Sequence, residues 1–334
     1  MSRQCANRFR LKNLMAVIVP VLLMLLLPGR AGAGESVVVG YREDARPFVH
    51  MSDPEGPKFS GFLSDFCDAA LSLAGYEVKR VAVDAASRWR KLDNDEVDML
   101  CDTTSVTLER AGKRLFTPII FLSGVSYAYS AKAEQAFLSA YSAAASGAEA
   151  AGEPVGGGPA LGSAPFCAGQ VATLQPSLPA DRLPVLRVGV LNETTAQEAV
   201  RNSETLKLFR LRKGEKICIK SLTGNYEKGV ADLCRGDIAF FFGDRDMLQS
   251  YLEAHLQQDK ACDAILSGKF YSYEPYALVV RPDRVDLAVA LQAAIYETFA
   301  SGKADSLFND HFRDRPKSSL LEALFRINRI GRVE

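Results

Sequence analysis

The segment from residue 97 to residue 110 contains the residue types that bind a small anion. A short apolar strand leads into a hydroxyl-rich turn with Thr103 and Ser105. Thr107 follows at an N-cap position, where a side-chain oxygen accepts from a helix N–H. Arg110 falls in the first helical turn, where the dipole disfavours a cation unless an anion is present. We expect either a carboxylate site formed by Arg110, Thr103 and Ser105, or an ordinary capped helix with a solvated arginine.

Strands alternate with helices on both sides of this segment, which indicates βαβ units and mostly parallel sheets. The first series is a strand over residues 36–40, a helix over 62–74, strands over 77–83 and 97–100 with a helix from 87 to 92 between them, and a helix over 108–115. The second series has strands over residues 186–191, 216–221 and 238–242, with helices that begin at Thr195 and end at Leu233. The fold class is therefore α/β, and roughly 300 residues predict two domains.

Between the two series lies a low-complexity stretch, residues 131–184, rich in Ala, Gly, Ser and Pro. Its glycines at 156–158 follow no predicted strand, so they indicate a linker and not a phosphate-binding loop. We interpret the stretch as a surface insertion in the second domain.

The N-terminus has the pattern of a secretory signal peptide. Basic residues precede an apolar run over residues 14–27, and Ala31-Gly32-Ala33 supplies a cleavage site of small residues. The run is shorter than the roughly 20 residues that span a bilayer, which leaves an uncleaved anchor as the alternative. We expect a periplasmic protein.

Charge argues against nucleic acid or an anionic membrane surface as partner. The chain has 40 basic and 40 acidic side chains, and residues 1–33 carry five of the bases and no acid. The mature chain is therefore acidic by about five charges.

Six cysteines remain after the signal segment, an even number that predicts disulfides in an oxidising compartment. They are Cys67, Cys101, Cys167, Cys218, Cys234 and Cys262. Cys67 falls on the first helix and Cys101 on a neighbouring strand, so we expect that pair to bond; free buried thiols are the alternative. The absence of a C-x-x-C motif and the scattered histidines predict no metal site.

Taken together, the motifs resemble the type II periplasmic solute-binding proteins of polar amino-acid ABC transporters (family 3), closest to the glutamate/aspartate-binding branch. The resemblance rests on Gly61-Phe62 with Asp65, Asp98 with Thr107-x-x-Arg110, Phe116-Thr117-Pro118, Thr194-Thr195, the strand that ends at Asp244, Glu274-Pro275-Tyr276, and the segment from Ser301 to Phe312. Each motif alone is weak, and their order and spacing carry the assignment.

The resemblance implies a two-lobed fold with a ligand cleft between lobes, each a mostly parallel sheet flanked by helices. Residues 35–130 and 272–334 would form lobe 1, and residues 131–271 lobe 2. It implies a monomer without a cofactor that binds an amino acid and delivers it to an inner-membrane ABC permease.

The resemblance also implies roles for single residues. Arg110, with Thr103 and Ser105, would bind the ligand α-carboxylate, and Thr195 would close on the same group from the second lobe. Asp244 would bind the α-ammonium; the alternative is a solvated acid beside Arg245. Two departures are Ala239, where many relatives have an aspartate, and Glu193, where a glycine is common.

Arg42 and Arg88 resemble the two arginines with which the acidic branch meets a ligand side-chain carboxylate. Two guanidiniums near one pocket repel each other unless an anion lies between them, which predicts an acidic or strongly polar ligand. Tyr226 falls where that branch has another polar contact. The alternative is that both arginines pair with Glu43, Asp84 or Asp93 on the surface.

Two other functions are compatible with the resemblance. A dehydratase-like enzyme on the same fold would need a general acid in the cleft, for which Glu43 or Glu193 are the candidates. A ligand-sensing partner of a membrane receptor would use the same binding residues.

The signal-peptide pattern predicts cleavage after Ala33. Mass spectrometry of the exported protein should give a chain that begins at Gly34. An intact N-terminus on protein recovered from the membrane fraction would instead support the anchor.

Overall fold

The structure is a computed structural model of the chain and describes residues 35–53, 55–132, 170–173, 185–201, 216–222, 225–313 and 315–329. The predicted signal segment, most of the stretch 131–184 and Cys167 lie outside these residues. Within the described part, no helix has the length and apolar character needed to cross a membrane.

The first sheet has five strands in the order β5-β1-β6-β15-β7. They are β1 (Ser36–Arg42), β5 (Glu77–Val83), β6 (Met99–Cys101), β7 (Leu115–Phe116) and β15 (Val279–Val280). β1 runs parallel to β5 and β6, whereas β15 is antiparallel to both of its neighbours.

The second sheet has seven strands in the order β13-β8-β12-β10-β11-β9, with β14 also paired to β8. They are β8 (Phe121–Ser130), β9 (Gln170–Thr173), β10 (Val185–Leu191), β11 (Lys216–Leu222), β12 (Phe240–Asp244), β13 (Ala264–Leu266) and β14 (Ser272–Tyr276). β10 is parallel to β11 and β12, and the remaining pairs are antiparallel. Each sheet thus has a parallel centre, as predicted, extended by antiparallel strands that the sequence pattern did not reveal.

A small antiparallel sheet and nine described helices complete the described part of the fold. The strands are β2 (Asp44–Ala45), β3 (Val49–Asp53) and β4 (Lys58–Ser60). The helices are α2 (Phe62–Leu73), α3 (Arg88–Asp93), α4 (Leu108–Ala111), α6 (Thr195–Arg201), α8 (Tyr226–Cys234), α9 (Arg245–Gln258), α10 (Val285–Ala300), α11 (Lys303–Phe312) and α12 (Ser319–Asn328).

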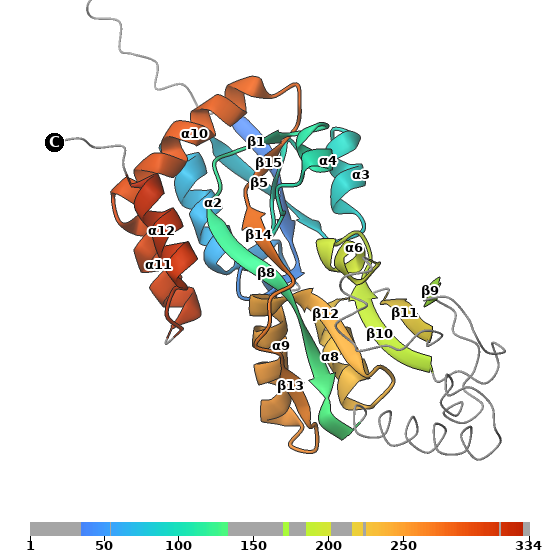
Figure 1. Cartoon of the computed structure of the whole chain (residues 1–334). Helices are drawn as coiled ribbons and strands as arrows, with labels where there is room; N and C mark the ends of the chain where they lie inside the picture. The colour runs from blue at the N-terminus through green and yellow to red at the C-terminus, as the bar shows by residue number, and fades with distance from the viewer. Residues whose placement is uncertain are drawn as a thin grey trace, which may run out of the picture. The chain divides into compact units, whose positions relative to one another are not determined.

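The main core packs the first sheet against the helices α2, α10, α11 and α12, which gather on one side of it, and continues into α8, α9 and the second sheet (Figure 1). Phe121 of β8 stacks on Phe312 of α11 with ring centroids 5.3 Å apart, and Phe48 meets Phe121 edge-on at 4.8 Å. Because burying one such side chain stabilises a fold by about 1.5–3 kcal/mol, this aromatic cluster fixes the C-terminal helices against β8.

Two strands, β8 and β14, run side by side between the region of the first sheet and the second sheet (Figure 1). The chain passes from β7 to β8 and returns from β14 to β15, which makes two crossings. Both strands pair within the second sheet, although the predicted lobe boundaries place them in lobe 1.

Most predicted elements are confirmed, and the helix predicted over residues 108–115 is wrong beyond its first turn. α4 ends at Ala111, and Leu115–Phe116 forms β7. Leu115 and Phe116 instead pair with β15, whose ladder satisfies their backbone groups. Long-range pairing therefore overrides the helical spacing of the leucines.

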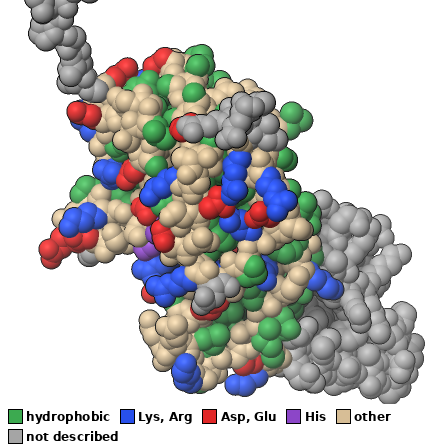
Figure 2. Space-filling model, turned by 90° about the vertical axis from the view of Figure 1, so that its left-hand side faces the viewer, with side chains coloured by type: hydrophobic (Ala, Val, Ile, Leu, Met, Phe, Trp, Pro, Cys, Tyr) green, Lys and Arg blue, Asp and Glu red, His purple; other side chains and the backbone are tan. Residues whose placement is uncertain are grey.

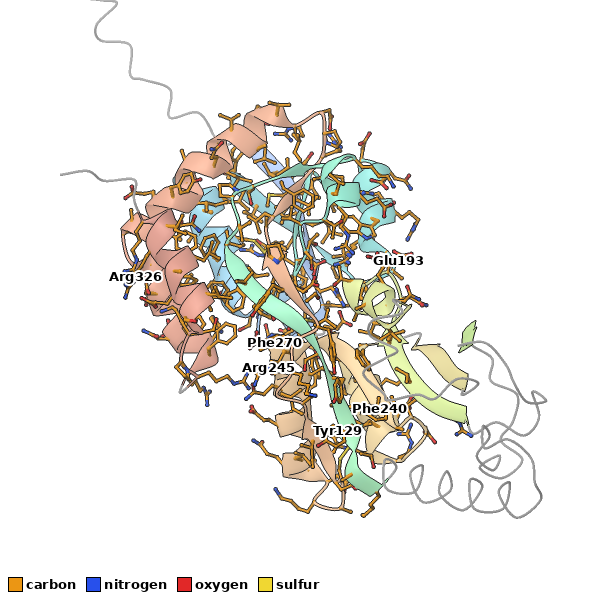
Figure 3. The ribbon with its side chains drawn as sticks, in the orientation of Figure 1. Tyr129, Glu193, Phe240, Arg245, Phe270 and Arg326 are labelled. Carbon is orange, nitrogen blue, oxygen red and sulfur yellow. A yellow bond between two sulfur atoms is a disulfide. The ribbon has the colours of Figure 1, made fainter. Side chains whose placement is uncertain are left out.

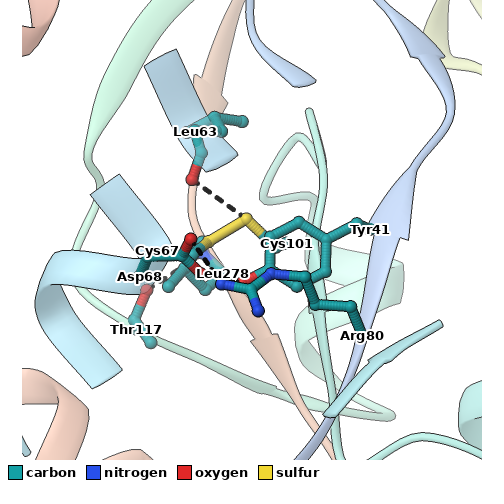
Figure 4. Close-up of a disulfide and its surroundings, with 8 residues drawn as sticks. All are labelled: Tyr41, Leu63, Cys67, Asp68, Arg80, Cys101, Thr117 and Leu278. Carbon is teal, nitrogen blue, oxygen red and sulfur yellow. Dashed lines mark hydrogen bonds and ion pairs between the residues drawn. A yellow bond between two sulfur atoms is a disulfide. The ribbon is translucent and has the colours of Figure 1, made fainter. Parts of the chain in front are cut away.

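Cys67 of α2 and Cys101 of β6 form a disulfide with an S–S distance of 2.02 Å and Cα atoms 6.3 Å apart (Figure 4). A second disulfide joins Cys234 of α8 to Cys262. The cysteine side chain at 218 lies outside the described side chains.

Basic and acidic side chains are interspersed on the face drawn in Figure 2, without a broad patch of one sign. Such a mixed surface does not provide the one-sided field that attracts polyanions.

The Cys67–Cys101 bridge closes a loop of 34 residues, which limits the unfolded ensemble. We expect the double variant Cys67→Ala/Cys101→Ala to lose about 2–5 kcal/mol of unfolding free energy in denaturant titrations. Cys234→Ala/Cys262→Ala, with a separation of 28, should lose a similar amount because loop closure depends weakly on length. Unchanged stability in the first variant would contradict a structural role.

Candidate functional site

One cavity of about 400 Å³, its opening included, is lined by all eight side chains that the sequence predicts to bind ligand. These are Arg42, Arg88, Thr103, Ser105, Arg110, Thr195, Tyr226 and Asp244. Six further lining residues are Val125, Thr194, Ala196, Met247, Glu274 and Tyr276.

The strand ends explain this convergence. Arg42 is the last residue of β1, and Thr103 follows β6, so both lie at the carboxyl edge of the first parallel sheet. Asp244 ends β12 and Thr195 begins the helix after β10, at the corresponding edge of the second sheet. Ligands in α/β folds bind at the carboxyl ends of parallel strands, where loops and helix starts present polar groups.

Asp102 does not line the cavity itself but forms buried ion pairs with two lining arginines. Its side chain is fully buried and pairs with Arg88 through Oδ2 and with Arg42 through Oδ1 at 3.5 Å. The hydroxyls of Thr103 and Thr104 donate to the same carboxylate at 3.2 and 3.3 Å. Burial alone would raise the pKa of Asp102, but the two guanidiniums outweigh it and lower the pKa to about 2.

Arg42 has a second carboxylate partner, because its Nε donates to Asp44. Arg42 and Arg88 are each 2% exposed. The alternative that places these arginines in surface pairs with Glu43, Asp84 or Asp93 is therefore wrong, and the anion between the two guanidiniums belongs to the protein itself.

Arg88 also connects the two sides of the cavity. Its Nη2 donates to the backbone oxygen of Glu193 at 3.1 Å, which links α3 to the turn before α6. Glu193 adopts a φ of 58°, a left-handed conformation that favours glycine and costs a side-chain-bearing residue about 1 kcal/mol. The side chain of Glu193 is exposed and does not line the cavity (Figure 3). It therefore does not place a negative charge beside Thr195 in the cavity.

Arg110 is held without a carboxylate. Among the described residues no acid lies within ion-pair distance of it; Nη1 donates instead to the backbone oxygen of Ser105 at 3.1 Å. Its guanidinium lies 5.5 Å from the centre of the Trp89 ring, a cation–π contact that fixes it beside the cavity. Thr107 caps α4 as predicted, accepting from the backbone N–H of Arg110 at 3.3 Å. Burial and the nearby charge of Arg88 lower the pKa of Arg110.

Asp244 is a buried acid and not the solvated loop residue of the alternative interpretation, since it is 6% exposed. It caps α9 by accepting from the N–H of Met247 at 2.9 Å, and the Tyr276 hydroxyl donates to its other oxygen. Its own N–H donates to the Tyr226 hydroxyl at 2.8 Å. Burial, with the charge of Asp246, raises the pKa of Asp244 to about 7.

The sequence did not single out Asp102, Glu274 or Tyr276 as site residues. Glu274 of β14 is 5% exposed; Oε1 accepts from the Ser272 hydroxyl at 2.6 Å, while Oε2 is buried and has no partner in the described part of the chain. The position of Asp102, next to Thr103 at a strand end, was an available signal. Glu43 and Glu193, the candidate general acids, are both exposed and lie outside the cavity lining.

Because its pKa is raised, Asp244 should make the free energy of unfolding depend on pH. An unfolded aspartate ionises near pH 4, whereas the folded one holds its proton to about pH 7. The contribution of Asp244 is therefore favourable below pH 4 and is lost as the pH rises through about 7. Denaturant unfolding at pH 5 and pH 8 should show that Asp244→Asn, which retains the N-cap, gains stability over wild type as the pH rises. A pH-independent difference would contradict this assignment.

Comparisons with solved structures identify the fold. An ancestral arginine-binding protein bound to glutamine is 17% identical, with a TM-score of 0.55 over 83% of this chain and 97% of that one. The GluR0 ligand-binding core from Nostoc punctiforme in complex with L-glutamate is 16% identical, with a TM-score of 0.56 over 83% and 99%. An ancestral amino acid-binding protein, described as a precursor of cyclohexadienyl dehydratase, is 16% identical, with a TM-score of 0.57 over 83% and 96%.

No curated protein sequence matches the chain. The family model of the bacterial extracellular solute-binding proteins, family 3, matches residues 37–314, which is most of the sequence. The order of motifs along the chain, the two sheets with a polar cavity and this match agree. The chain belongs to the bacterial extracellular solute-binding proteins, family 3.

Proposed function

We propose that this protein is the periplasmic substrate-binding component of an ABC transporter for a polar α-amino acid. The observation that carries the proposal is that one cavity is lined both by Arg110, which pairs with no carboxylate among the described residues, and by the buried acid Asp244. Arg110 and Asp244 offer opposite charges to the two ends of a zwitterion. One similar solved structure is described as the substrate-binding protein of an amino-acid ABC transporter.

The carboxylate end of the ligand would face Arg110. A guanidinium presents two parallel N–H groups that match a carboxylate, and the lining hydroxyl of Ser105 adds a donor from the same side. Thr103 lines the same side, and its O–H, which donates to Asp102 in this structure, would have to turn to reach the ligand. Thr195, at the start of α6, would contribute from the other side. The charge of Arg110 and the hydroxyl groups beside it favour an anionic group of the ligand over a cationic one.

The ammonium end of the ligand would face Asp244. Its two oxygens accept from Met247 and Tyr276 and keep lone pairs for a further donor. A bound ammonium favours the ionised carboxylate, so ligand binding would release a proton near neutral pH. The cost of burying this acid is then offset when the ligand is present.

Residues 35–130 with 272–334 and residues 131–271 are the lobes that we propose to close on this ligand. The bond from Arg88 to the Glu193 backbone would stabilise the closed form, because it joins elements on opposite sides of the cavity. An inner-membrane permease would recognise that form. Two alternatives are that the bound form is recognised by a sensory receptor, or that the protein converts its ligand. Product analysis after incubation with the ligand would reveal the second.

The sequence predicts an acidic ligand from Arg42 and Arg88, and this finer prediction stays open within the proposed function. The ligands named for similar structures include glutamine and glutamate, so they do not select among side chains. Selectivity depends on the charges around these two arginines.

Replacing Arg110 with lysine keeps the charge and removes the fork. We expect Arg110→Lys to weaken binding of the best L-amino acid ten- to hundredfold, about 1.5–3 kcal/mol, in calorimetric titrations. Arg114→Lys is the matched control: Arg114 stacks on the same Trp89 ring at 4.3 Å and pairs with Asp93, but does not line the cavity. Its affinity should remain near wild type. Equal effects of the two substitutions would place the carboxylate elsewhere.

A further inference from the structure

A carboxylate of the protein lies behind the cavity wall, paired with the two lining arginines that the sequence predicts to meet an acidic side chain. Asp102 has both oxygens engaged, Oδ2 with Arg88 and Oδ1 with Arg42, and two threonine hydroxyls complete its contacts. The side chain is fully buried and cannot exchange these partners for water. The repulsion between the two guanidiniums is thus relieved before any ligand enters.

The balance of charges around the cavity also disfavours an acidic side chain. Three guanidiniums, on Arg42, Arg88 and Arg110, are set against the carboxylates of Asp44, Asp102, Asp244 and Glu274. A zwitterion adds equal positive and negative charge. A side-chain carboxylate would add another buried anion where the acids already equal or outnumber the bases, and burying an uncompensated charge is costly.

Buried polar atoms that lack a partner among the described residues indicate which hydrogen-bonding groups the ligand side chain should have. Within the described part of the chain, Arg42 Nη2 and Arg88 Nε have no acceptor and Glu274 Oε2 has no donor, and all three residues line the cavity. An acceptor oxygen, neutral or charged, satisfies the first two, and an N–H or O–H group satisfies the third, so Glu274 is the group that discriminates. A carboxylate side chain has no donor for Glu274 and would meet it as a like charge.

We infer that Asp102 is a built-in counter-ion of Arg42 and Arg88, and that the site takes an α-amino acid whose side chain carries no negative charge and donates a hydrogen bond to Glu274. This inference rests on the proposed function, because it takes an α-amino acid as the ligand. It makes Asp102 a specificity-determining residue: the acid occupies the role that the side-chain carboxylate of glutamate or aspartate would otherwise have.

The first test is the ligand ranking of the wild-type protein. Thermal-shift and calorimetric titrations with the twenty common L-amino acids should rank glutamate and aspartate at least tenfold below glutamine, asparagine or a basic amino acid. Glutamate or aspartate as the tightest ligand overturns the inference and leaves the proposed function intact. Binding of none of the twenty overturns the proposed function, and the inference with it.

The second test changes the counter-ion. Asp102→Asn keeps the size of the side chain and removes its charge, so the affinity ratio of glutamate to glutamine should rise at least tenfold. Asp232→Asn is the matched control, since Asp232 is a buried acid, 1% exposed, that pairs with Lys228 and Arg235 away from the cavity. Its ratio should equal that of wild type.

An unchanged ratio in folded Asp102→Asn overturns the inference. If this variant unfolds without ligand, its melting curve decides: glutamate should restore a cooperative transition at a lower concentration than glutamine does. Restoration by glutamine alone, or by both at equal concentration, is the contrary result. The wild-type ranking remains decisive in either case.

Discussion

The buried carboxylate of Asp102 between Arg42 and Arg88 is the interaction on which the cavity depends. It allows two guanidiniums to lie side by side in a wall that is almost closed to water. Through Arg88 it also reaches the backbone of Glu193 on the opposite side of the cavity. Removing one member of such a buried network typically costs several kcal/mol, because the remaining charges lose their compensation. The geometry of the cavity and the contact across it therefore share one electrostatic origin.

In the proposed function, the ligand binds to residues outside that network, and the ion pairs of Asp102 stay intact. Arg110 and Asp244 stand apart from the network, each with capacity for a further partner. One is held by an aromatic ring and a backbone oxygen, the other by a helix N-terminus and a tyrosine. Neutral or backbone contacts orient these groups without cancelling their charges, which leaves both available to a zwitterion.

The sequence predicted eight of the residues that line the cavity, because strand ends and helix starts are local signals that place side chains at one edge of a sheet, but it did not single out Glu274. The sequence-based predictions were wrong or incomplete where the structure depends on pairing between segments far apart in the sequence. Leu115 and Phe116 pair with β15, about 160 residues later, and this pairing ends the predicted helix. Asp102 lies 60 residues from Arg42 and 14 from Arg88, so its place at a strand end was visible in the sequence but its pairing with both arginines was not. Glu193 occupies a left-handed position that local propensity assigns to glycine.

The central claim is that the cavity recognises both charged ends of an α-amino acid. It is tested most directly by calorimetric titration of the tightest L-amino acid against its decarboxylated amine, which keeps the side chain and the ammonium and lacks only the group for Arg110. The account predicts that the amine binds at least a hundredfold more weakly, because the half-buried guanidinium of Arg110 is left without its carboxylate. Equal affinity for the two compounds would contradict it.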